Sequence, residues 1–197
     1  MIFTRAFVLM LSGATAVFGY PQMLHSPDAL LSNYTLGNIT WTGNITSYGT
    51  EMTFTGPTMQ DIETQILQVN PSFSWESHGG SNRSTLAKRK KDYVSCDPNG
   101  FWWAQAYRIR EGMDYLSRIT GWCHTPSRNC GRPSCGYHSA IYWCNDNDYP
   151  VDIPCEFWTE YTQDILDKCL VDDPAQQVKG QAFDDDNWNI IVGWGDC

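Results

Sequence analysis

Two histidines, His124 and His138, are the side chains of the C-terminal half best suited to acid–base chemistry near neutral pH. A small extracellular hydrolase would pair one of them with a carboxylate as general acid and base. The carboxylates considered are Glu111, Glu156 and Glu160. The sequence contains no GxSxG, HExxH or P-loop motif. We therefore predict two loop histidines and no catalytic residue, and a hydrolase is kept as the second alternative.

The eight cysteines all follow residue 95, and an even number crowded into one half of an exported chain predicts disulfides. The sequence contains no CxxC pair, so it gives no sign of a zinc site. The Asp- and Asn-rich stretches 144–148 and 183–189 lack the EF-hand spacing, so we expect turns there, with no metal and no cofactor. We predict four bridges among Cys96, Cys123, Cys130, Cys135, Cys144, Cys155, Cys169 and Cys197.

Geometry restricts the pairing of these cysteines only slightly. Cys155 and Cys169 lie at the ends of a predicted helix, about 21 Å apart if the helix is continuous, whereas a disulfide needs Cα atoms about 4.4–6.8 Å apart. We expect Cys169 to reach into a sheet instead. A bridge from Cys197 would hold the last strand in place. The remaining connectivity stays open.

The start of the chain predicts export. Residues 1–19 combine Arg5, an apolar run too short to cross a bilayer and the small residue Gly19, as a signal peptide does. We expect a secreted, extracellular protein with no stable membrane insertion. Four N-x-[ST] sequons predict a glycoprotein, and all precede the first cysteine: Asn33, Asn38, Asn44 and Asn82.

The basic run Lys88, Arg89, Lys90 and Lys91 separates the sequons from the cysteines. After Lys91 the chain has seven Lys and Arg against seventeen Asp and Glu, so a nucleic-acid patch is the weakest interpretation. An uncut linker remains an alternative. We predict a dibasic site for a processing protease of the kexin kind, which needs an exposed, extended backbone. Residues 20–91 would be a glycosylated pro-region, and residues 92–197 the cysteine-rich mature domain.

The mature region predicts two amphipathic helices, over residues 104–120 and 154–171. Pro154 suits the start of the second helix. Strands are predicted over 140–144, 177–183 and 188–194, the last two as a hairpin, with a weaker strand near 92–96. We expect an α+β fold: a small disulfide-rich domain with two helices packed on an antiparallel sheet, preceded by a signal peptide and a loosely ordered pro-region.

Trp102, Trp103 and Trp122 fall outside the helical stripes, in loops or at the edges of elements. Exposed indoles there would stack on sugar rings or anchor a protein partner. The alternative is that they cap the core of a small domain.

Four segments carry a resemblance to known proteins: 113–123, 135–147, 164–169 and 178–193. With "CGYHSAIYWCNDN" and "VKGQAFDDDNWNIIVG", the C-terminal half resembles small secreted cysteine-rich fungal proteins, many of them candidate effectors. It is also distantly similar to the killer toxins of smut fungi, some of whose relatives are cut from precursors at Lys-Arg. The strong negative charge departs from the basic surface of the toxins thought to act on ion channels, so no active residue is transferred.

The resemblance implies a non-enzymatic extracellular protein. We expect an effector or killer-toxin-like protein that is released from a precursor at the dibasic site and binds an extracellular target on a host or competitor. A carbohydrate-binding module of the cell wall is the first alternative. The partner would be an unknown extracellular protein or a wall carbohydrate, and we expect no nucleic acid.

Overall fold

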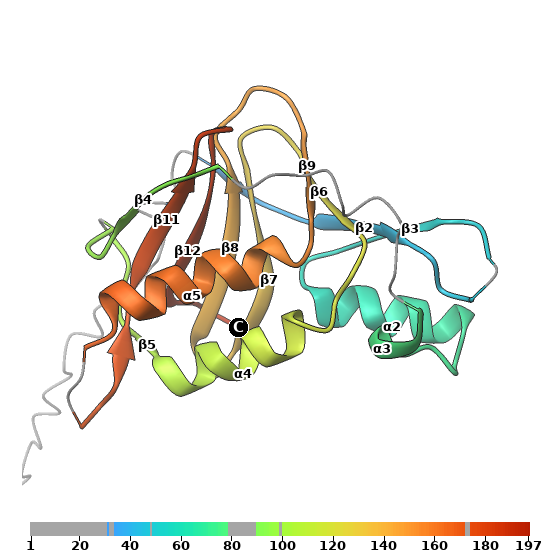
Figure 1. Cartoon of the computed structure of the whole chain (residues 1–197), viewed down its shortest axis with the longest axis horizontal. Coiled ribbons are helices and arrows are strands. Elements are labelled where there is room, and N and C mark those ends of the chain that lie inside the picture. The colour runs from blue at the N-terminus through green and yellow to red at the C-terminus, as the bar shows by residue number, and fades with distance from the viewer. Residues whose placement is uncertain (1–30, 32–33, 48, 79–89, 99, 172–173) are drawn as a thin grey trace, which may run out of the picture.

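The structure is a computed structural model of the whole chain. It describes residues 31, 34–47, 49–78, 90–98, 100–171 and 174–197 (Figure 1). The predicted signal peptide, the sequon residues Asn33 and Asn82, and the basic residues Lys88 and Arg89 lie outside the described residues.

Six strands form the larger sheet, and two helices cover one of its faces (Figure 1). All neighbouring strands are antiparallel except β1 and β7. The strands lie in the order β1 (Thr35–Leu36), β7 (Asn129–Gly136), β8 (Ser139–Asn145), β12 (Trp188–Trp194), β11 (Gly180–Asp184) and β4 (Lys91–Ser95). The helices are α4 (Ala106–Leu116) and α5 (Phe157–Cys169). The predicted packing of two helices on a mainly antiparallel sheet is therefore confirmed. The predicted hairpin forms between β11 and β12, but residues 177–178 of its predicted first strand pair with β5 instead.

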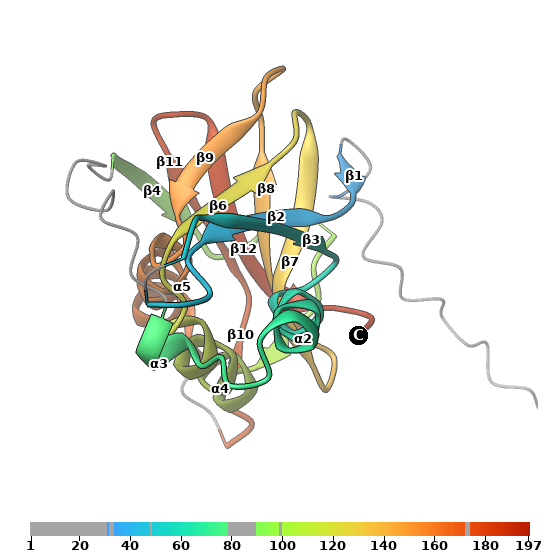
Figure 2. The ribbon, with the colours of Figure 1, turned by 90° about the vertical axis from the view of Figure 1, so that its right-hand side faces the viewer.

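A second, four-stranded sheet runs across the strands β7 and β8 of the first, as Figure 2 shows. Its strands lie in the order β3 (Met52–Gly56), β2 (Ile39–Gly43), β6 (Trp122–Thr125) and β9 (Val151–Pro154). Helix α2 (Met59–Val69) packs beside β3 and β7 and is followed by the short α3 (Trp75–His78); Thr58 caps α2 by accepting a hydrogen bond from the Asp61 N–H. The short strands β5 (Ala104–Gln105) and β10 (Gln177–Val178) pair separately.

The expected loose order of residues 20–91 is wrong for the part that the structure describes. Strand β2 pairs with β6 of the cysteine-rich region, and β1 pairs with β7. The buried side chains of β2 and α2 belong to the same core as those of α4, α5 and the larger sheet. At the centre of this contact Trp41 is fully buried and donates its indole N–H to the Thr120 carbonyl oxygen at 2.7 Å. Apolar burial thus overrides the polar composition of this segment.

Polar contacts reinforce the join between the two parts of the chain. The Tyr34 hydroxyl donates to the Asp146 carboxylate, and the Tyr115 hydroxyl of α4 donates to Glu63 of α2 at 2.8 Å. Burial, together with the bond to Glu63, raises the pKa of Tyr115, so its hydroxyl stays protonated and keeps donating. The described residues between 34 and 78 therefore share one core with the cysteine-rich region.

All eight cysteines form disulfides, as predicted: Cys96–Cys169, Cys123–Cys155, Cys130–Cys144 and Cys135–Cys197. Cys155 and Cys169 do not pair with each other; Cys169 reaches the end of β4, and Cys197 reaches β7. Every bridge joins residues beyond 95, so among the described residues no disulfide links the segment 34–78 to the rest of the chain.

The predicted helices are too long at both ends, since α4 spans 106–116 and α5 spans 157–169, and local contacts explain their later starts. Ala104 and Gln105 are extended because β5 pairs with β10. Pro154 ends the edge strand β9 instead of starting a helix, which fits a residue without an N–H to donate to a sheet. Gly121 has a φ of +103° and lies against Trp41, so its turn needs a residue without a Cβ.

Cutting the chain within residues 79–89 should leave the two pieces associated, because a shared core and two strand pairings hold them together. A specific protease site inserted there would test this expectation. We expect the pieces to co-elute on native size exclusion and to separate in denaturant without any reductant. Trp41→Ala is the control, since losing a buried tryptophan costs about 3–5 kcal/mol and should promote dissociation. Separate elution of the folded wild-type pieces would contradict the expectation.

The fold should also lose stability at alkaline pH. Burial raises the pKa of Tyr34, Tyr115 and Tyr142 above the ordinary value near 10, and that of Tyr142 reaches about 12. Above pH ~10 the unfolded chain releases these protons first, so the free energy of unfolding falls as pH rises through the folded values. Denaturant melts at stepped pH measure this decline, and Tyr142→Phe should make it shallower. An unchanged slope in that variant would exclude Tyr142 as a contributor.

Candidate functional site

Three tryptophans and a glutamine line an open groove of about 500 Å³ at the end of β12. We call this the indole groove; it is formed by Trp102, Trp103, Gln177 and Trp194. Trp102 and Trp103 are 49% and 37% exposed, which is unusual for the largest apolar side chain and marks a surface available to a ligand.

Backbone pairing brings these residues together from three places in the chain. The Trp194 N–H donates to the Trp102 carbonyl oxygen at 2.8 Å. Gly193 allows this approach, because a Cβ there would lie 2.6 Å from Phe101. The next residues form β5, which pairs with β10 and places Gln177 opposite Gln105. The segment 101–103, which is not itself a strand, is therefore held between its bond to β12 and the short strand β5.

Charged and aromatic neighbours hold the indole rings. The His138 ring stacks on Trp194, with 5.2 Å between ring centroids and 5° between their planes. The Lys179 Nζ lies 5.1 Å from the Trp103 centroid and forms an ion pair with Asp97. A cation over an indole face restricts the ring and lowers the entropy lost when a ligand binds.

A second aromatic cluster adjoins His138 in the chain. Tyr137 precedes it in the turn between β7 and β8, and both residues have positive φ, at 51° and 59°. The Arg108 guanidinium lies 3.8 Å from the Tyr137 centroid and 4.6 Å from that of Tyr107. Glu111 accepts from Arg108 at 2.7 Å. Tyr137 is 75% exposed, so this turn adds aromatic surface next to the histidine in the chain.

The structure separates the three predicted binding tryptophans. Trp102 and Trp103 lie together in the indole groove, whereas Trp122 lies on β6 of the four-stranded sheet. One polar row crosses the strands on the outer face there: Thr55, Thr40, His124 and Asp152. The neighbouring row is mixed, with Thr53 and Thr42 followed by Trp122 and the buried Pro154. Trp122 is half-buried beside Thr42 and is no part of the groove.

The prediction of two loop histidines is wrong for His124, which lies on β6, and correct for His138, which lies in the turn between β7 and β8. His124 Nδ1 contacts the carboxylate of Asp152, not that of Glu111, Glu156 or Glu160, on the open face of the smaller sheet. His138 serves as a stacking partner of Trp194. A His–Asp pair can orient a base, but 40% and 62% exposed side chains leave it in water, where such a pair is weak.

The Asp- and Asn-rich stretches do form turns, as predicted. Asn145 donates to the carbonyl oxygens of Pro126 and Tyr149, and Asn147 donates to those of Asp186 and Asn187. The hydrogen bonds of Asn147 connect the turn after β8 to the turn between β11 and β12. Within the described ranges, no three His, Cys, Asp or Glu residues gather closely enough to hold a metal ion.

The remaining predicted residues are placed as follows. Among the sequon residues, Asn38 is exposed just before β2, and Asn44 is half-buried just after it. Among the basic residues, Lys90 forms an ion pair with Asp186, and Lys91 begins β4.

The sequence analysis missed Trp194. In an alternating strand over 188–194, Trp194 belongs to the row of even-numbered residues, whose other members pack in the main core. Its position at the last residue of that row was the available signal.

Comparisons with known proteins supply no relative. The chain matches no protein-family model, no curated protein and no solved structure. In the part that the structure describes, none of the helices has the length and apolar character needed to cross a membrane.

The exposed indoles should dominate quenching of the protein's fluorescence by acrylamide. Trp41, Trp75, Trp143, Trp158 and Trp188 are at most 4% exposed, so a soluble quencher reaches them poorly. We expect Trp102→Phe with Trp103→Phe to lower the Stern–Volmer slope strongly while stability changes by less than about 0.5 kcal/mol. Trp143→Phe, the buried control, should lower emission without lowering the slope. An unchanged slope in the double variant would show that the groove is closed in solution.

Proposed function

We propose that the protein is a secreted, disulfide-stabilised binding protein of the effector or killer-toxin kind, released from a precursor, which holds an extracellular target on a host or competitor in its indole groove. The observation that carries the proposal is the grouping of Trp102, Trp103 and Trp194 around one open groove. Tryptophan is the residue most enriched among those that dominate binding energy at interfaces.

Other features support an extracellular site of action. Four disulfides suit an oxidising compartment, and they join the cysteines into a domain whose exposed aromatic surface is backed by strands rather than loops. Rigid backing matters because a preorganised site loses less entropy on binding. The surface charge of the region after Lys91, at seven basic against seventeen acidic residues, disfavours nucleic acid.

Binding to intact cells tests this function. Fluorescently labelled protein would be added to plant, yeast and filamentous fungal cells, with Trp102→Ala/Trp103→Ala compared against Trp122→Ala. We expect the groove variant to bind at least about tenfold more weakly, and the matched control on the other sheet to bind like the wild type. Equal binding by all three proteins, or no binding to any cell, would refute the groove as the target site.

A wall carbohydrate is the second candidate for the target, because flat indole faces with an amide and a lysine at the rim suit a sugar ring. The same cells treated with protease or with glucanase and chitinase separate the two. Binding that survives protease but not the glycosidases, and retention on insoluble glucan or chitin, would favour the carbohydrate. The reverse pattern would favour a protein.

The hydrolase alternative would rest on the His124–Asp152 pair. It predicts turnover of a wall polymer or peptide that His124→Ala abolishes. Binding without any product release, in wild type and variant alike, would remove it.

A further inference from the structure

The backbone of Lys90 is anchored at both of its polar groups. Its N–H donates to Asp184 Oδ2 at 3.0 Å, and its carbonyl oxygen accepts from the Asp185 N–H at 2.9 Å. Its ammonium group lies 2.6 Å from Asp186 Oδ1. Lys90 is thus held against the hairpin turn between β11 and β12 through three contacts with consecutive aspartates.

Asp184 is a buried carboxylate whose described donors are neutral. It is 6% exposed at the end of β11. The hydroxyl of Tyr161 and the N–H of Lys90 donate to its Oδ2, and the N–H of Asp186 donates to its Oδ1 at 2.9 Å. A buried carboxylate that meets only neutral donors is stabilised less than one that meets a cation.

We propose that the precursor is cut between Arg89 and Lys90, and that Asp184 binds the α-amino group which this cut creates. Hydrolysis adds one water: the carbonyl carbon of Arg89 becomes a carboxylate, and the nitrogen of Lys90 takes up protons to become an ammonium. That nitrogen is the atom already 3.0 Å from Asp184 Oδ2, so the ion pair forms without rearrangement. The inference rests on release from a precursor, which is part of the proposed function.

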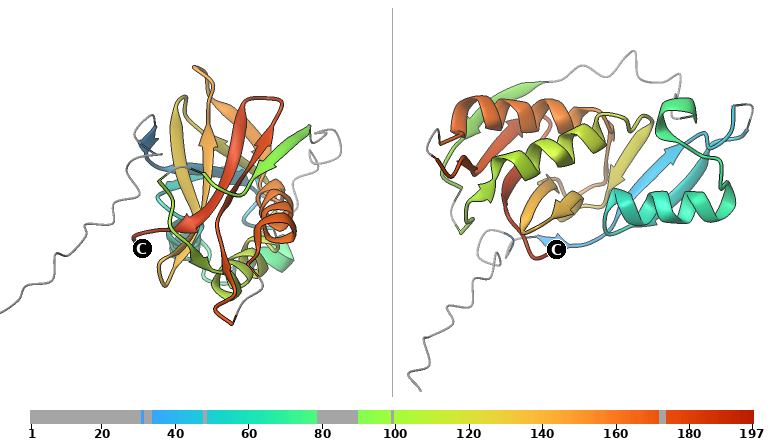
Figure 3. Two further views of the ribbon diagram at one scale, coloured as in Figure 1. Left: turned by 90° about the vertical axis from the view of Figure 1, so that its left-hand side faces the viewer. Right: turned by 90° about the horizontal axis from the view of Figure 1, so that it is seen from below.

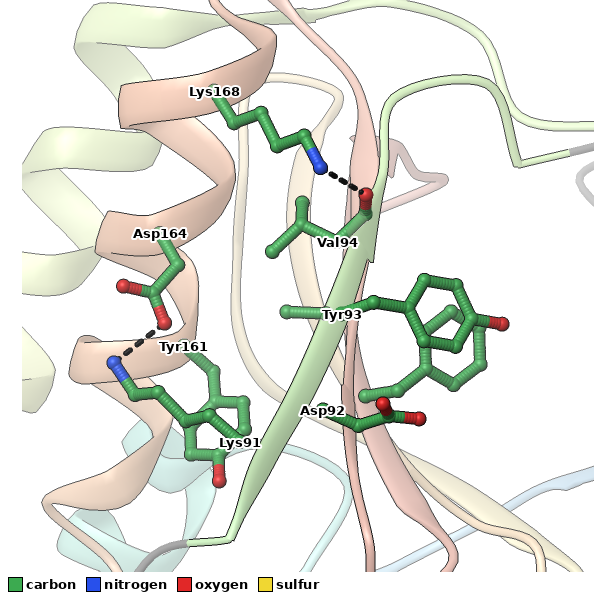
Figure 4. Close-up of a pocket in the computed structure, with 9 residues that line it drawn as sticks. Lys91, Asp92, Tyr93, Val94, Tyr161, Asp164 and Lys168 are labelled. Atoms are coloured by element: carbon green, nitrogen blue, oxygen red, sulfur yellow. Dashed lines mark hydrogen bonds and ion pairs between the residues drawn. The ribbon is translucent and has the colours of Figure 1, made fainter.

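The contacts of Lys91 favour this bond over the one after Lys91. Lys91 opens β4, faces Asp184 across the ladder with β11, and places its Nζ 2.5 Å from Asp164. Figure 4 shows its side chain extending from the strand to α5, where it also lies near Tyr161. A protease must draw several residues into an extended conformation. Cutting after Lys91 would end the ladder at that point and discard Lys90 with its contacts to the turn, whereas cutting before Lys90 leaves all of these contacts in the product.

The cut changes the strength of one interaction in the finished protein. A neutral N–H donor becomes a charged one, and charge-assisted hydrogen bonds are roughly twice as strong as neutral ones. An α-amino group ordinarily loses its proton near pH 8, and an adjacent carboxylate favours the charged form. Strand β4 is an edge strand, and its N-terminal end is a point where the sheet would otherwise fray. Lys90 directly precedes this end. Processing thus secures the edge of the larger sheet.

The N-terminal sequence of the second chain in the purified secreted protein is the first test. A chain starting at Lys90 is expected. A start at Lys91 or Asp92, or an uncut chain, would overturn the assignment of the bond. The cell-binding assay of the groove variants reports independently of this result, so failure here leaves the test of the groove intact.

A thermal cycle tests the role of Asp184. Protein cut by a kexin-type protease is compared with uncut protein, in the wild type and in Asp184→Asn. Cutting also removes the tether between the pieces, but this effect is common to both proteins. We expect cutting to change the melting temperature more favourably in the wild type, by about 2–4 °C. An equal change in both would refute the ion pair.

A second pair of variants keeps Asp184 in place and covers the case in which Asp184→Asn does not fold. When Lys90→Gln is cut, the new terminal glutamine cyclises with loss of ammonia to a pyroglutamate, whose nitrogen is a neutral N–H. Lys90→Met keeps a free α-amino group, and both variants lose the contact to Asp186 equally. We expect the gain on cutting in Lys90→Met and not in cyclised Lys90→Gln. Equal behaviour would overturn the proposal.

Discussion

The burial of one tryptophan between two parts of the chain is the constraint on which the rest of the structure depends. Trp41 projects from β2 into the common core, where its ring centroid lies 5.3 Å from that of Trp75 and its indole N–H donates to the Thr120 carbonyl oxygen. Gly43 and Gly121 lie so close to its ring that a Cβ on either would fall within 3 Å of it. Strand, helix and turn are therefore fitted around a single side chain, and Figure 3 shows the segments that meet there from two further sides.

The position of the helices over β12 explains why the indoles of the groove lie outside the core. The core side of β12 carries Trp188, Ile190 and Val192 beneath the helices, and the same row ends at Trp194 where the helical cover ends. Segment 101–103 crosses at that point and turns Phe101 inward against Tyr142, with the two following indoles left outward. The groove thus continues the apolar row of β12 beyond the part of the strand that the helices cover.

The sequence predicted the elements that carry a strong local pattern and missed those defined by distant partners. Helices α4 and α5 and the hairpin β11–β12 have clear periodicity, so their type was predictable and only their ends shifted. Strand β2 also alternates, with Ile39 and Trp41 inward and threonines outward, but sequons and polar residues around it suggested loose order. Two of the groove's tryptophans were predicted, whereas Trp194 and Gln177 join them only through pairing between segments far apart in the chain.

The pairing of β2 with β6 also determines when the protein can fold. The indole of Trp41 and its partner Thr120 are separated by 79 residues, so the smaller sheet cannot close until most of the chain has left the ribosome. Such non-local contacts slow folding, because the entropy of closing the loop is lost before any contact compensates for it. An intact connection keeps the early segment at a high effective concentration near its partners. If the chain is cut as proposed, this architecture allows only one temporal order, in which assembly is complete before the connection is severed.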